Sequence, residues 1–94
     1  MIVIAEDETL IVVQQTDHAH LSAELLALWR TGDLLDHPRR EEILFAAREH
    51  DNGWREEDAA PRLNRETGGP HTFRTLPAGA RLDLWQRGVD RFSA

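Results

Sequence analysis

The 94-residue chain is acidic, with 17 Asp and Glu against 11 basic residues and a formal net charge of −6, and it has no cysteine. Its length predicts one domain, residues 1–94, with one modest core. Arginines never gather without interleaved acids, and no apolar run nears the ~18–20 residues of a membrane span, so neither nucleic acid nor a membrane is an expected partner. Disulfides and thiolate ligands are excluded, and without a signal segment the cytoplasm is the expected compartment.

The first 14 residues predict a β-hairpin. Residues 2–5 and 10–14 are rich in β-branched side chains, and the polar residues 6–9 separate them. Two strands alone are marginal in water, so the hairpin needs further elements to pack against.

Three helices are expected after the hairpin, over residues 17–30, 38–51 and 78–92, with Thr16 capping the first. Residues 31–37 form a connection, and residues 55–76 form a long irregular loop. The fold class is therefore mainly α (α+β), a hairpin followed by three helices. Each helix carries an apolar stripe expected to face the core. The stripes are Leu21, Leu25, Leu28 and Trp29; Ile43, Ala46, Ala47 and His50; and Leu82, Trp85, Val89 and Phe92.

Two histidines share these stripes, His18 on the first helix and His50 on the second. Helices joined by a short connection usually pack antiparallel, so the start of one lies beside the end of the next and the two imidazoles can meet. Asp51 adds a carboxylate. Two imidazoles and a carboxylate suit Zn, Mn, Fe, Co or Ni, and three protein ligands leave positions open for catalysis.

Neighbouring residues are candidates for binding a small anionic substrate. Arg48 and Arg55 flank the His-Asp pair, although salt bridges to nearby acids are the plainer interpretation. Trp54 is expected either as a hydrophobic lid or as a staple over the helix end, which Gly53 closes in the left-handed conformation. Asp58 is a further acid, or a solvated charge.

Three segments, residues 17–19, 37–41 and 50–54, resemble an uncharacterised bacterial family, domain of unknown function 3891. The His-Asp-Asn-Gly-Trp motif at 50–54 is the most specific part, and the resemblance covers essentially the whole chain. It implies no known activity, and it implies that the chain corresponds to the N-terminal part of a longer family domain. It also suggests the plan of the HD superfamily of helical, metal-dependent phosphohydrolases, in which His18 matches the early histidine and His50-Asp51 the later pair.

Three functional hypotheses follow. The first is a metal-dependent phosphohydrolase acting on a small phosphorylated or nucleotide substrate. HD enzymes also need an aspartate on a late helix, and the resemblance is weaker there because Asp83 and Asp90 lie off the apolar stripe. The second is a non-catalytic module in which the His-Asp pair is a buried hydrogen-bond hub. The third is a homodimer that covers apolar surface on the hairpin and the last helix.

Overall fold

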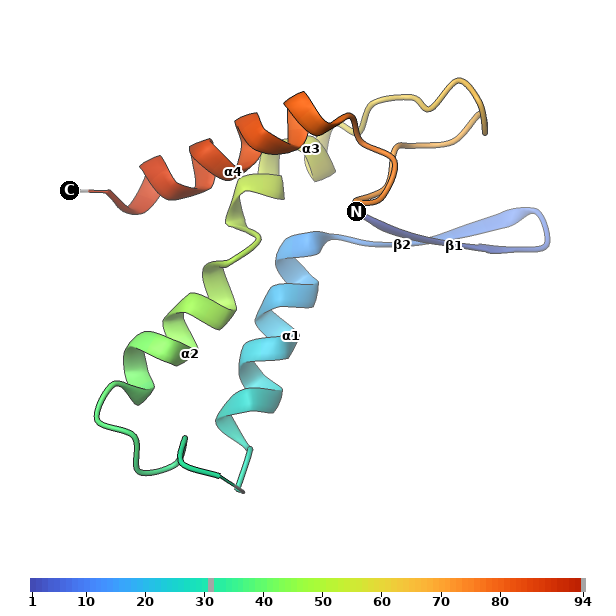
Figure 1. Ribbon diagram of the computed structural model, residues 1–94. Coiled ribbons are helices and arrows are strands. Elements are labelled where there is room, and N and C mark those ends of the chain that lie inside the picture. Colours follow the sequence, from blue (N-terminus) through green and yellow to red (C-terminus); the bar gives the residue numbers. More distant parts are fainter. Residues whose placement is uncertain (31, 94) are drawn as a thin grey trace.

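The computed structural model describes residues 1–30 and 32–93 and confirms a hairpin followed by helices, a mixed α+β fold (Figure 1). Thr31, the first residue of the predicted connection, and Ala94 lie outside the described residues. Helices α1 and α2 run side by side in opposite directions, and α4 crosses beyond the end of α2. The elements are β1 (Ile2–Glu6), β2 (Thr9–Val13), α1 (Gln15–Ala27), α2 (Arg40–Glu49), the 3₁₀ helix η1 (Asn52–Trp54), α3 (Arg55–Ala59) and α4 (Ala78–Phe92).

The hairpin pairs β1 with β2 in antiparallel register, from Ile2 opposite Val13 to Glu6 opposite Thr9. Each strand therefore extends one residue further toward the turn than the sequence predicts. A two-residue turn connects them, and Asp7 there adopts a positive φ of 54°, a conformation that Asp tolerates better than most residues. The hairpin projects from the helices as an arm (Figure 1).

Helix α1 begins at Gln15, two residues before the predicted start. Thr16 is not its cap: the N-cap residue is Gln14, and its side chain makes no capping hydrogen bond. The free backbone N–H of Gln15 instead donates to Asp58 Oδ2 at 2.6 Å. A carboxylate 43 residues away thus caps the helix, where a negative charge also suits the helix dipole.

The predicted apolar stripes of α1 and α4 do not form the core. Leu25 of α1 and Val89 of α4 are 58% and 62% exposed, and the rest of both stripes is exposed too. Helices α1 and α2 bury Ala19, Ala23 and Leu44 instead, because small side chains let neighbouring helices approach closely. On α2, Ile43 and Ala47 are half-buried, while Ala46 and His50 are exposed.

The small core lies where α4 crosses η1. It consists of Trp54, Leu76 and Leu84, with Ala80 packed against it.

Ion pairs connect α4 to α3 beside this crossing. Arg87 Nε lies 3.1 Å from Glu56 Oε2, and Arg91 donates to the other oxygen of the same carboxylate. Burial works to raise the pKa of the Glu56 carboxyl, but a backbone hydrogen bond and the guanidinium groups of Arg91 and Arg87 outweigh it, so that the pKa is lowered. The ion pairs hold α3 against α4.

The segment expected as an irregular loop is partly ordered. It begins with α3, and Leu63 and Pro70 form an isolated β-bridge. Asn64 is buried between them, where its backbone N–H donates to Gly69 O at 2.7 Å and its carbonyl accepts from Gly68. These local hydrogen bonds replace the regular structure that the Pro- and Gly-rich sequence cannot adopt.

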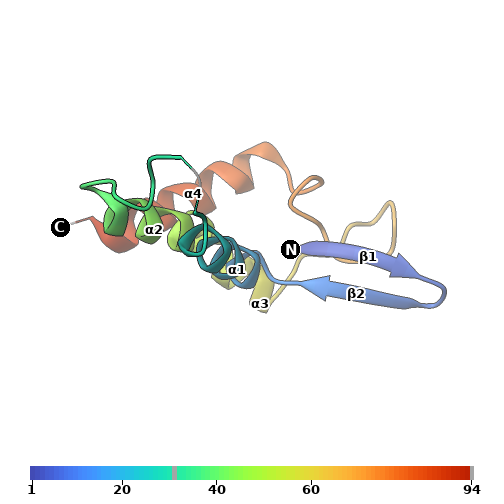
Figure 2. The same ribbon diagram turned by 90° about the horizontal axis from the view of Figure 1, so that it is seen from below.

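The described residues form a flat, open body of 48 × 35 × 18 Å with a radius of gyration of 15.7 Å. Figure 2 shows this thin profile, with α1 and α2 in front of α4. None of the described helices is both long and apolar enough to cross a membrane.

Candidate metal centre

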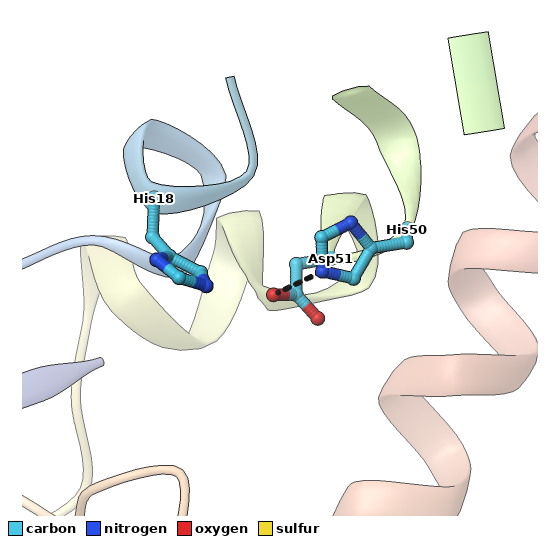
Figure 3. A group of neighbouring side chains, drawn as sticks. All are labelled: His18, His50 and Asp51. Atoms are coloured by element: carbon cyan, nitrogen blue, oxygen red, sulfur yellow. Dashed lines mark ion pairs between the residues drawn. The ribbon is translucent and has the colours of Figure 1, made fainter. Parts of the chain in front are cut away.

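His18, His50 and Asp51 come together between the start of α1 and the end of α2. One ligand atom from each residue lies within 4.8 Å of the others. Figure 3 shows the two imidazole rings on either side of the Asp51 carboxylate. The ring centroids are 6.4 Å apart and the rings are inclined at 73°. The antiparallel arrangement of α1 and α2 produces this meeting.

The hydrogen bonds of His50 define which ring nitrogen carries a proton. Nδ1 lies 2.6 Å from the carbonyl oxygen of Ala47, which can only accept, so Nδ1 is the donor. In the neutral ring Nε2 therefore presents a lone pair, and it lies 3.2 Å from Asp51 Oδ2. Two acceptors face each other at that distance only when a proton or a cation lies between them.

The same oxygen of Asp51 is also held by Gln15, the first residue of α1. Gln15 Nε2 donates to Asp51 Oδ2 at 3.2 Å, while the backbone N–H of the same residue donates to Asp58. Gln15 and Asp58 are buried, at 6% and 5% exposure. The buried Gln15 Oε1 has no hydrogen-bond partner among the described residues.

The three side chains carry the donor atoms that a divalent transition-metal ion takes, and they lie close enough together to be a candidate site. A histidine that binds a metal through one nitrogen commonly donates its other N–H to a carbonyl, as His50 does to Ala47. Gln15 likewise orients the Asp51 carboxylate, by donating a hydrogen bond to it. His18 and His50 are exposed, so a bound ion would keep positions open toward solvent.

Two of the predicted substrate-binding residues are not accessible to a substrate. Trp54 is 4% exposed and belongs to the core with Leu76 and Leu84, so its ring is not free to act as a lid. Asp58 is not solvated, because its Oδ1 lies 2.8 Å from the amino group of Met1 while Oδ2 caps α1. Asp58 supports the site indirectly, because it holds Gln15, which bonds to Asp51.

The two arginines lie on the surface, in different places. Arg48 lines a hollow with His20 and Leu44, and a turn of about 100° per residue places His20 on the other side of α1 from His18. The structure therefore does not bring Arg48 to the cluster. Arg55 is exposed at the start of α3, four residues after Asp51.

Asn52 and Gly53 have roles that the sequence interpretation missed. Asn52 is a buried hub: its Nδ2 donates to Glu49 O at 2.8 Å, and its Oδ1 accepts from Arg91 at 2.8 Å. Gly53 does not adopt the predicted left-handed conformation. A Cβ at Gly53 would lie 1.9 Å from the carbonyl oxygen of Leu84, so close backbone packing is what requires glycine there. In the sequence, the adjacent Asn52 and Gly53 of the motif were the signal from which these roles could have been inferred.

No curated protein and no solved structure matches the chain. The family described as "Protein of unknown function (DUF3891)" matches residues 1–94, which is the whole chain. The chain therefore belongs to the DUF3891 family, whose description names no activity.

Proposed function

We propose that the protein is a cytoplasmic metal-dependent phosphohydrolase that binds one divalent transition-metal ion (Zn, Mn, Fe, Co or Ni) through His18, His50 and Asp51. The observation that carries the proposal is the approach of His50 Nε2 to Asp51 Oδ2 at 3.2 Å while Nδ1 is committed to Ala47. A cation between the two lone pairs resolves their repulsion, and His18 lies where it completes a set of three ligands.

The chain's own residues prepare this site. Ala47 fixes the tautomer and the ring orientation of His50, and Gln15 orients the Asp51 carboxylate. When bound, a divalent ion would act as a Lewis acid toward a phosphate ester and would lower the pKa of water, so that the water loses a proton to solvent and attacks as hydroxide. Arg55 is the exposed cation that we propose for orienting a small phosphorylated or nucleotide substrate.

The first test is metal content. The tag-free chain, reconstituted and dialysed, should hold about one transition-metal ion by inductively coupled plasma mass spectrometry. His18→Ala should lose it, because each ligand supplies a large part of the affinity. His20→Ala is the matched control, since His20 is exposed on the same helix but lies outside the cluster. Parent protein without metal would overturn the proposal.

Hydrolysis is then measured on p-nitrophenyl phosphate and on nucleoside phosphates. Asp51→Asn should abolish the activity, whereas Asp33→Asn, an exposed carboxylate remote in sequence, should leave it unchanged. Activity that survives in Asp51→Asn and in His50→Ala would show that another site performs the reaction.

The non-catalytic alternative has one observation in its favour. If His50 is doubly protonated, its contact with Asp51 is an ion pair that links the end of α2 to η1 and needs no metal. The exposure of His50 argues against a buried hub. In that alternative His50→Ala lowers the melting temperature of metal-free protein, and neither protein binds metal.

A further inference from the structure

The side chains around the metal cluster form an apolar surface that nothing in the described part of the chain covers. His18 shares its side of α1 with Leu21 and Leu25, three and seven residues further on, which are 55% and 58% exposed. His50 shares its side of α2 with Ala46 and the half-buried Ile43. We call this surface, together with Trp85, Val89 and Phe92 of α4, the cluster face.

The cluster face contains a protruding part and a hollow part. The protruding part consists of Leu21 and Leu25 of α1, whose side chains are exposed to solvent. Between α2 and α4 lies a groove of about 430 Å³, whose walls include His50, Ala46, Trp85 and Val89. A contact about a two-fold axis uses the same patch on both copies, so a patch with a projection and a hollow can pair with itself.

The exposed area is large enough to include a subunit interface. A folded monomer of 10.7 kDa typically exposes about 5,500 Å², whereas this chain exposes 6941 Å². The excess, about 1,400 Å², lies within the roughly 1,000–2,500 Å² that each subunit of an obligate homodimer buries. The radius of gyration of 15.7 Å also exceeds the roughly 12 Å of a compact chain of this length.

The paired charges of α4 lie away from its exposed apolar stripe. Arg87 and Arg91 of α4 contact Glu56 at its other side, and Gln86 donates to Asp90 along the helix. The exposed stripe between them is apolar, and apolar helix faces of this extent are typical of subunit interfaces.

We propose that the cluster face is a homodimer interface: the α1 leucines of one copy enter the α2–α4 groove of the other, and the metal cluster of each copy borders the contact. The proposal does not depend on metal binding. It differs from the homodimer expected from the sequence in using α1 and the groove instead of the hairpin.

The experiment is a measurement of mass by light scattering coupled to size-exclusion chromatography, from about 1 to 100 μM. The mass of the parent measured by light scattering should be twice 10.7 kDa. Leu25→Glu should weaken dimerisation at least about tenfold, because it places a charge in the apolar contact. Leu63→Glu is the matched control: the residue is the same, it is 62% exposed, and it lies in the loop before α4. It should remain dimeric.

Two results would overturn the proposal. One is a parent that is monomeric throughout this range. The cluster face would then be covered by a different protein or by a large apolar ligand, and not by a second copy. The other is a dimer that Leu25→Glu leaves intact while its circular dichroism matches the parent. Asp51→Asn, at the half-buried ligand that is not part of the cluster face, should lose metal and stay dimeric, so that failure of the metal site and failure of the interface are distinguishable.

Discussion

At the residue scale, two glycines decide how closely α4 approaches η1. Gly53 and Gly88 face each other, and a Cβ at Gly88 would lie 3.2 Å from the backbone nitrogen of Gly53. The side-chain amide of Asn52 donates a hydrogen bond to the carbonyl of Gly88 beside this contact, and Trp54 packs in the adjacent core. The His-Asp-Asn-Gly-Trp motif therefore combines two proposed metal ligands with three residues that build the support beneath them.

Gly53→Ala should destabilise the protein by about 3 kcal/mol, because its new Cβ has only backbone atoms to displace. Gly79→Ala is the matched control, since nothing lies within 4 Å of that position in the first turn of α4. There the substitution should stabilise by about 0.5–1 kcal/mol through helix propensity. Urea denaturation of the two variants measures both. Equal stabilities would show that the close approach of η1 and α4 is absent in solution.

The site residues differ in how far the sequence reveals them. His18, His50 and Asp51 follow from helical periodicity and antiparallel pairing, both of which are local regularities. Gln15 could not be predicted, because its role depends on Asp58, 43 residues away. Such long-range polar contacts leave no periodic signal.

At the scale of elements, α4 begins and ends where its pattern predicts, at Ala78 and Phe92. Pro77 before it and the amphipathic spacing within it are local signals. The direction in which the stripes point was predicted wrongly, because periodicity identifies an apolar face but not the surface that covers it. In α1, burial follows the small residues Ala19 and Ala23.

The attachment of α3 to α4 should weaken in acid. The lowered pKa of Glu56 means that the folded state binds its proton less readily than the unfolded state. The stabilisation is fully present above the ordinary carboxyl pKa of 4.5 and is lost as the pH falls through the lowered value.

Thermal melts between about pH 7 and pH 3 test this, since they span the titration of the carboxyl group. Glu56→Gln should melt at a lower temperature than the parent at neutral pH, and the difference should shrink as the pH falls. Glu66→Gln, at an exposed glutamate in the loop, serves as the control. A difference that stays constant with pH would assign the effect to packing instead of charge.

At the scale of the whole molecule, dimerisation should make the melting temperature depend on protein concentration. If folding is coupled to pairing, a tenfold rise in concentration should raise the melting temperature of the parent by about 3–4 °C. Leu63→Glu should show the same rise, and Leu25→Glu a much smaller one. Calorimetry at two concentrations measures this, and a melting temperature independent of concentration would indicate a self-sufficient monomer.

The thinness of the body has a consequence for hydrogen exchange. At 18 Å, a single copy is less than two helix diameters deep, and almost every backbone amide lies near solvent. Its amides are therefore expected to exchange through small local openings, with little of the slow exchange typical of a thick core. The slowest amides should lie where other atoms shield the backbone on both sides, at the η1–α4 crossing and, in the paired state, along α1.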